Sequence, residues 1–247
     1  MSEWKQKVAG NFDACAHRYD HYGRIQNKIA QNLAATLPEF DKPDILEIGC
    51  GTGALTQYLL SAYKDGRFHV TDISPQMINH ARARIGALDE VEWSVMDGEN
   101  PASDRRYDLI IGNMAFQWFE NADEALERLR GFLNPGGAVF YTVPAPACFK
   151  EWRSVLSEMS LSDGMLEFKT LPGVFKEEEM VESHKDTLHF LKSLKQLGAS
   201  TPHEGYEKLS RRDLLKACRV ADERFHAQMT WRILYGQLKG DSACPVK

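Results

Sequence analysis

Residues 45–53 read Ile-Leu-Glu-Ile-Gly-Cys-Gly-Thr-Gly, a short apolar run that ends in three glycines at alternate positions. Leu55, Leu59 and Leu60 follow at helical spacing. A strand that breaks into a glycine turn and opens a helix is typical of a nucleotide-binding βαβ unit. Glycine suits this turn because a ligand must approach the main chain closely. The G-x-G-x-G spacing differs from the dinucleotide fingerprint G-x-G-x-x-G, and this difference disfavours an NAD-dependent dehydrogenase.

Polar residues stand where the next strand-like segments end. Asp72 follows Gly53 by nineteen residues, where a βαβ unit places a carboxylate that accepts both ribose hydroxyls. Asp97 with Gly98, and then Asn113, end the two segments after it. Ligands of open α/β sheets bind outside the carboxyl ends of the strands, so we expect these residues to share one site. The expected strands after the glycine loop are 68–71, 91–96, 107–112 and 138–143.

Composition restricts the class of protein. The 247 residues, 43% of them apolar and 26% charged, suffice for one large α/β domain with a filled core. No apolar run approaches membrane-spanning length, and the first residues lack the hydrophobic stretch of a signal peptide. Five scattered cysteines without a C-x-x-C pair favour free thiols in the cytoplasm and disfavour structural zinc. The net charge of −5 disfavours nucleic acid as the main substrate.

The glycine loop, with Glu47 two positions before its first glycine, resembles the E/D-x-G-x-G-x-G motif of the class I S-adenosylmethionine-dependent methyltransferases. The resemblance implies S-adenosyl-L-methionine as the cofactor. It implies that the loop passes under the methionine part, that Asp72 holds the ribose and that Asp97 binds the adenine amino group. It also places Asn113 near the ribose or the methionine backbone, and Ile73 and Met77 against the adenine ring. The cofactor-binding residues expected on this basis are Tyr19, Gln26, Glu47, Gly49, Gly51, Gly53, Asp72, Ile73, Met77, Asp97, Gly98 and Asn113.

The expected fold is a Rossmann-like, mostly parallel sheet of seven strands with helices on both faces, N-terminal helices and a lid insertion after the fifth strand. Helical apolar spacing runs through the first forty residues, and an expected helix at 149–159 follows the fifth strand. An edge strand at 179–185 and a helix over 188–197, stopped by Gly198, come next. We interpret the chain as one domain composed of an N-terminal helical cap, a cofactor-binding core, a substrate lid with late core elements, and a last strand, at 1–40, 44–143, 144–219 and 226–238.

Segments outside the glycine loop indicate a subfamily. The run Phe12–Asp20 with Gln26 is similar to the opening of the biotin-pathway malonyl-[acyl-carrier protein] O-methyltransferases. The similarity continues through three later stretches, 113–118, 190–199 and 230–236, and so covers nearly the whole chain. Cys15 and His17 depart from the usual pattern. The resemblance implies methylation of the free carboxylate of a malonyl thioester on acyl carrier protein, at the start of the synthesis of the pimelate moiety of biotin.

This reaction requires little acid–base catalysis from the protein. A malonyl carboxylate is ionised at neutral pH, so no general base is required, and alignment with exclusion of water is the main demand. Tyr19, Gln117 and Trp118 are the candidate pocket residues, and Phe116 is expected beside them. A cation or hydrogen-bond donors must orient the carboxylate. The candidates, among which the sequence does not decide, are Arg24, Arg153, Lys192 and Lys195.

Other functions stay open at this point. A methyltransferase for a small-molecule carboxylate, or for a carbon in quinone synthesis, would act without a carrier protein. A cofactor-binding protein without catalysis is disfavoured by the intact glycine loop with Asp72 and Asp97. His17 and His21 lie four residues apart, but no further ligand motif supports a metal site. The oligomeric state is not determined.

Overall fold

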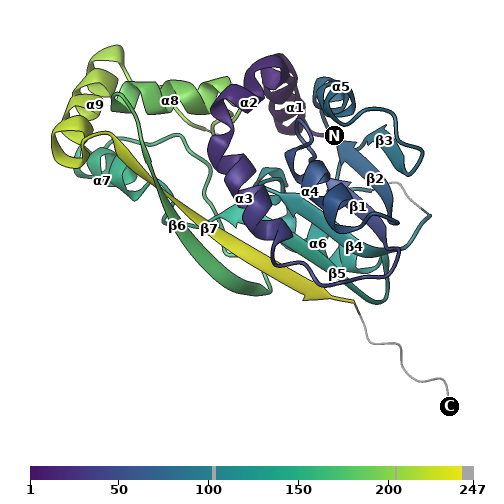
Figure 1. Ribbon diagram of the computed structural model, residues 1–247. Helices are drawn as coiled ribbons and strands as arrows, with labels where there is room; N and C mark the ends of the chain where they lie inside the picture. The colour runs from purple at the N-terminus through teal and green to yellow at the C-terminus, as the bar shows by residue number, and fades with distance from the viewer. Residues whose placement is uncertain (102–103, 204, 241–247) are drawn as a thin grey trace.

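The computed structural model describes residues 1–101, 104–203 and 205–240, and Cys244 lies outside these residues. Seven strands form one sheet in the order β3-β2-β1-β4-β5-β7-β6 (Figure 1). All neighbours are parallel except β7, which runs antiparallel to both β5 and β6. The predicted mostly parallel, seven-stranded fold is therefore confirmed. The strands are β1 (Asp44–Ile48), β2 (Arg67–Asp72), β3 (Val91–Val95), β4 (Tyr107–Asn113), β5 (Leu133–Pro144), β6 (Val174–Ser183) and β7 (Gln228–Lys239).

The strand order reverses between β1 and β4. The chain moves from β1 outward to β2 and β3, and then returns to pair β4 with the other side of β1. Connections leave the sheet in opposite directions at such a point, which opens a crevice at the carboxyl ends of the strands. The loop after β1, the end of β2 and the end of β4 border this crevice.

Helices cover both faces of the sheet. Alternate residues of each strand point to opposite faces, so Ile45 and Leu109 belong to one buried cluster while Leu46 and Ile110 belong to another. Of the α-helices in the first 130 residues, three contribute side chains to the first cluster and one to the second, in agreement with Figure 1. These helices are α3 (Arg24–Ala34), α4 (Ala54–Ala62) and α5 (Pro75–Ile85) on the first face and α6 (Ala122–Arg130) on the second.

Local signals explain where the core helices begin. The Ser74 hydroxyl accepts the Met77 N–H at 3.1 Å, and Pro75 occupies the first turn of α5. Asn121 caps α6 in the same way. No helix within the described part of the chain is both long and apolar enough to cross a bilayer.

The second half of the chain adds a long two-stranded extension to the sheet. Three helices gather at the far end of β6 and β7 (Figure 1). The predicted helices at 149–159 and 188–197 are confirmed to within one residue at each end, and α9 had not been delimited from the sequence. These helices are α7 (Lys150–Glu158), α8 (Thr187–Gln196) and α9 (Arg211–Phe225).

The edge strand differs from the prediction, because β6 begins at Val174 rather than at residue 179 and ends at Ser183. Acidic residues, which are depleted in strands, hide its first half in the sequence. Cross-strand partners from β7 compensate for their charge. Arg232 pairs with Glu177, and the Tyr235 hydroxyl donates to Glu178 at 2.6 Å.

The N-terminal segment is helical as predicted, but it is broken into several pieces. It comprises α1 (Glu3–Cys15), the 3-10 helix η1 (Ala16–Arg18), α2 (Tyr19–Tyr22) and α3. The Asn11 amide donates to Thr201 Oγ1 at 2.9 Å, and the Trp4 indole N–H donates to the Pro202 carbonyl at 3.4 Å. The beginning of the chain thus contacts the segment after α8, above the carboxyl ends of the strands.

Candidate functional site

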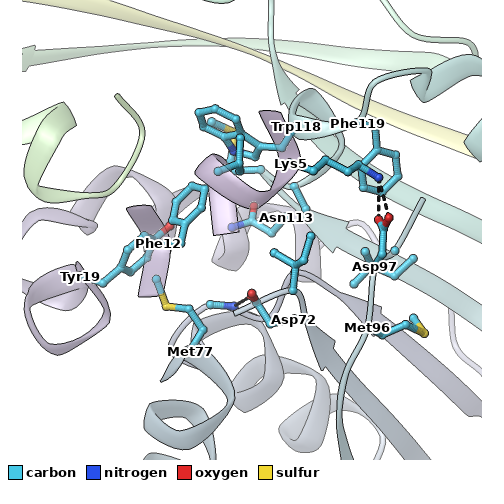
Figure 2. A pocket seen from close by; sticks show the side chains of 18 residues that line it. Lys5, Phe12, Tyr19, Asp72, Met77, Met96, Asp97, Asn113, Trp118 and Phe119 are labelled. Atoms are coloured by element: carbon cyan, nitrogen blue, oxygen red, sulfur yellow. Dashed lines mark hydrogen bonds and ion pairs between the residues drawn. The ribbon is translucent and has the colours of Figure 1, made fainter. Parts of the chain in front are cut away.

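A cavity, here called the inner cavity, lies at the carboxyl ends of β1, β2 and β4 under the N-terminal helices (Figure 2). It brings together nine of the twelve predicted cofactor residues. Gln26, Glu47 and Gly53 do not line it. The nine are Tyr19, Gly49, Gly51, Asp72, Ile73, Met77, Asp97, Gly98 and Asn113.

The glycine loop forms the floor of the inner cavity. Gly49 and Gly51 have φ values of +69° and +55°, in the left-handed region that side chains rarely adopt. A Cβ at Gly49 would lie 2.7 Å from Cβ of Ala115, whereas at Gly51 the nearest atom would be Cε1 of Tyr19, at 3.8 Å. The loop therefore leaves space beneath Tyr19 that a ligand can fill.

Asp72 is a buried carboxylate at the end of β2. Its two oxygens accept the backbone N–H groups of Gly51 and Ser74, each at 2.9 Å, which fixes the orientation of the side chain. Burial raises the pKa of Asp72 to about 6, because a desolvated charge is costly. Hydroxyl donors from a ligand would stabilise the ionised form. The position and the chemistry fit a ribose.

Glu47 and Gly53 support the loop from behind. Glu47 is buried and accepts the Thr56 hydroxyl of α4 at 2.7 Å, and burial raises its pKa to about 8. Gly53, with φ of +86°, packs against Ala81 of α5, where a Cβ would come within 3.2 Å. The geometry assigns both residues to holding the loop, so that they contribute to a ligand site without lining its cavity.

Lys5 was missed by sequence reasoning and enters the inner cavity from α1. Its amine lies 2.8 and 2.7 Å from the two Asp97 oxygens and 2.5 Å from Glu99, and only 3% of the residue is exposed (Figure 2). Burial raises the pKa of the Asp97 carboxyl, but hydrogen bonds from Lys5 and from the Glu99 backbone outweigh this and hold it below its usual value. A single lysine 92 residues away in sequence carries no spacing signal.

A second cavity, here called the outer cavity, adjoins the first. Four residues line both: Phe12, Tyr19, Met114 and Trp118. Its other walls come from the segment after α7, from α8 and from the segment between α8 and α9. Burial together with the nearby Asp72 and Asp20 carboxylates raises the pKa of Tyr19, so its phenol stays protonated. Tyr19 thus stands as a neutral group where the two cavities meet.

Gln26 and Gln117 line the outer cavity and keep unused hydrogen-bonding capacity. The Gln117 amide donates to the Met114 carbonyl at 2.7 Å. The side-chain oxygens of both glutamines are buried and have no partner among the described residues. Trp118 lines both cavities, as expected of a pocket wall. Phe116, predicted beside it, is instead fully buried in the core, where it packs edge-on against Tyr141.

None of the four predicted cations lines the outer cavity. Arg153 is 3.0 Å from Asp163 and donates to the Leu166 carbonyl, so it fixes a cavity wall from outside. Lys192 and Lys195 are exposed on α8. Arg24 borders a separate polar cleft beside the glycine loop, where Gln26 and Asn113 also lie. The cation that does line the outer cavity is Lys208, which the sequence had not indicated.

Comparisons with known proteins agree with this geometry. Residues 46–139 match a family described as methyltransferase domain. The Biotin biosynthesis bifunctional protein BioCD of Bordetella avium is 37% identical over 94% of this chain, which spans about half (52%) of that protein. Malonyl-[acyl-carrier protein] O-methyltransferase 2 of Ilyobacter polytropus is 30% identical over 80% of this chain and 82% of its own length. The chain belongs to the class I S-adenosylmethionine-dependent methyltransferases.

A solved structure extends the comparison to the fold of this methyltransferase. The N-methyltransferase NodS from Bradyrhizobium japonicum, in complex with S-adenosylhomocysteine, has a TM-score of 0.54 at 16% identity, with 98% of this chain and all of that chain covered. The fold is therefore that of the class I methyltransferases. The cofactor of this methyltransferase is S-adenosyl-L-methionine, as predicted, and the glycine loop with Asp72 fits it.

Proposed function

We propose that this methyltransferase acts on the free carboxylate of a malonyl thioester carried by acyl carrier protein, at the start of pimelate synthesis for biotin. The observation that carries the proposal is similarity over most of the chain to relatives that bear this activity in their names, such as the Ilyobacter polytropus protein. A mostly apolar outer cavity that meets the cofactor cavity at Tyr19 supports it. An extended thioester substrate needs such a passage.

The inner cavity is proposed to hold the cofactor. Gly49 and Gly51 lie under the methionine part, Asp72 accepts the ribose hydroxyls, and Asp97 with Gly98 contacts the adenine edge. The residues proposed to complete the site from the side and above are Ile73, Met77, Asn113 and Tyr19.

The residues at the junction of the cavities are proposed to align the reaction. When bound there, the cofactor would supply a methyl group on a positively charged sulfur, for transfer to the carboxylate oxygen of the substrate with the carbon–sulfur electron pair left on sulfur. Tyr19 and Trp118 exclude water from this point, because both line the two cavities where they meet. Gln117 lies beside them, and the ionised substrate requires no proton transfer.

The test is methyl transfer from labelled S-adenosylmethionine to malonyl-acyl carrier protein, compared with acetyl-acyl carrier protein and with free dicarboxylates. We expect a labelled methyl ester on the malonyl carrier protein alone. The Asp72→Asn protein, which we expect to bind the cofactor poorly, provides the background level of labelling. Labelling of a free dicarboxylate, with none on the carrier, would replace the proposal by a small-molecule methyltransferase.

A further inference from the structure

The outer cavity opens to solvent at a lysine. Three of its lining residues, Ser200, Pro202 and Lys208, are exposed and mark the mouth. Lys208 forms no ion pair or hydrogen bond with any residue in the described ranges. Asp163, the lining carboxylate, is already paired with Arg153 at 3.0 Å. Lys208 therefore presents its positive charge at the mouth without an ion-pair partner among the described residues.

The inner part of the same cavity offers hydrogen-bond acceptors. The unpartnered side-chain oxygens of Gln26 and Gln117 are buried, and the whole Gln26 residue is only 9% exposed. Leaving a buried acceptor without a donor is unfavourable, and a ligand N–H at either oxygen would remove that cost. Gln117 bonds to Met114, which lines both cavities. The acceptors thus lie near the junction, away from the mouth.

Helix α8 and the first part of α9 carry an excess of positive charge, although the protein as a whole is acidic. Residues 187–219 contain seven Lys and Arg against three Asp and Glu, whereas the whole chain has a net charge of −5. Beyond Lys208, the cations are exposed and form no ion pair with a described residue. They are Lys192, Lys195, Arg211, Arg212, Lys216 and Arg219. Such a surface attracts an acidic macromolecule.

We propose that the outer cavity binds the phosphopantetheine arm of an acidic carrier protein, with Lys208 on the phosphodiester at the mouth. The inference rests on the proposed function and adds the residue that recognises the arm. The arm carries, in order, an acyl thioester, two amides and a phosphodiester next to the protein. The outer cavity presents the Tyr19 junction and the glutamine acceptors near it at its inner part, and Lys208 at its mouth. The exposed cations of α8 and α9 then face the carrier protein.

The test compares two small substrates that differ by one phosphate, malonyl-phosphopantetheine and malonyl-pantetheine. With Lys208→Gln we expect kcat/KM to fall about tenfold for the phosphorylated substrate, as for the loss of one charge-assisted contact, and to stay unchanged for the other. Lys208→Arg should restore most of the difference. Lys64→Gln, an exposed lysine in the turn between α4 and β2, is the matched control.

A binding measurement separates this inference from the proposed reaction. Holo carrier protein has the phosphopantetheine arm and apo carrier protein lacks it, so we expect fluorescence anisotropy to show tighter binding of the holo form, lost in Lys208→Gln. Equal affinity for the two forms, or equal loss of kcat/KM on both small substrates, would overturn the role of Lys208. Intact Lys208-dependent binding without methylation would instead refute the reaction and leave the arm site standing.

Discussion

Two carboxylates at the ends of neighbouring strands have pKa values shifted in opposite directions. Asp72 has no cation partner in the described part of the chain, and its pKa is raised by burial, whereas Asp97 is held below its usual pKa by Lys5. Asp72 therefore changes protonation within an accessible pH range and Asp97 does not. Cofactor binding should consequently depend on pH through Asp72.

We predict that the dissociation constant for S-adenosylmethionine is constant above pH 7 and rises below about pH 6. Ribose hydroxyls donate to the ionised carboxylate, so protonation of Asp72, with its pKa of about 6, removes the acceptor. Asp72→Asn should weaken binding at least tenfold at pH 8, about 1.4 kcal/mol, and abolish the pH dependence. Calorimetry from pH 5.5 to 8 checks both, with Asp65→Asn, an exposed turn residue, as the control. A pH-independent wild-type affinity would contradict the role of Asp72.

We predict that Lys5→Met destabilises the protein by about 2 kcal/mol, because Asp97 and Glu99 lose their shared cation in a largely buried setting. Urea unfolding measures this free energy. Lys7→Met on the same helix is the control, since the Lys7–Glu3 pair is exposed and its loss should leave the unfolding midpoint unchanged. Equal changes in the free energy of unfolding of the two variants would show that the ion pairs of Lys5 contribute no more to stability than the exposed pair of Lys7.

The site residues that could be predicted from the sequence lie at the carboxyl ends of parallel strands, which meet at one edge of the sheet. Asp72 and Asn113 are the last residues of their strands and Asp97 follows β3 closely, so their position along the sequence was enough to predict that they share one cavity. Lys5 and Lys208 come from a helix and a loop whose packing depends on tertiary contacts, for which no short-range pattern exists.

Among the elements, α1 and the segment after α8 close the two cavities by mutual contact. Gly198, two residues past the end of α8 and with φ of +81°, approaches α1 so closely that a Cβ would lie 3.0 Å from the Asn11 carbonyl oxygen. This contact joins the N-terminal helices to the wall of the outer cavity. The position of α1 and access of a substrate are therefore linked.

We predict that Gly198→Ala lowers kcat/KM for the malonyl substrate more than it lowers cofactor affinity. The substitution imposes about 1–2 kcal/mol of backbone strain and also pushes the wall from α1. Gly136→Ala is the matched control, with φ of +83° and nothing within 4 Å of its Cβ. Denaturation should show a similar loss of stability in the two variants. Steady-state kinetics should show a loss of turnover in Gly198→Ala only. Unchanged turnover in Gly198→Ala would disprove the link.

Element prediction succeeded where local patterns are strong and failed where partners supply the stability. The helix over α8 has apolar spacing, an Asp186 cap and a glycine stop, and its bounds were found closely. The first half of β6 reads as a charged loop, since three of its five residues are Lys176, Glu177 and Glu178. Only its pairing with β7 makes it a strand.

The inner cavity is walled by the sheet and by α1 together, through Val8 and Phe12 of the helix. A ligand there must stabilise the native state and hold α1 in place. A ligand present at 100 times its dissociation constant increases the free energy of unfolding by about 2.7 kcal/mol.

We predict that S-adenosylhomocysteine raises the melting temperature and slows amide hydrogen exchange in α1 more than in α9. Helix α9 serves as the internal control, because none of its residues lines the inner cavity. Mass spectrometry with and without the ligand provides the comparison. Equal protection of the two helices would mean that α1 does not respond to the cofactor.

The position of β7 between β5 and β6 has a consequence for how the protein is made. Translation delivers β5 and β6 before β7, yet β6 pairs with β7 and with no other strand in the described part of the chain. Because synthesis adds about 5–20 residues per second, the apolar edge of β5 and the whole of β6 stay unpaired for several seconds until residues 228–239 have been made. During that interval the nascent chain exposes unpaired strands, so its yield in a cell should depend on the supply of chaperones that bind such segments.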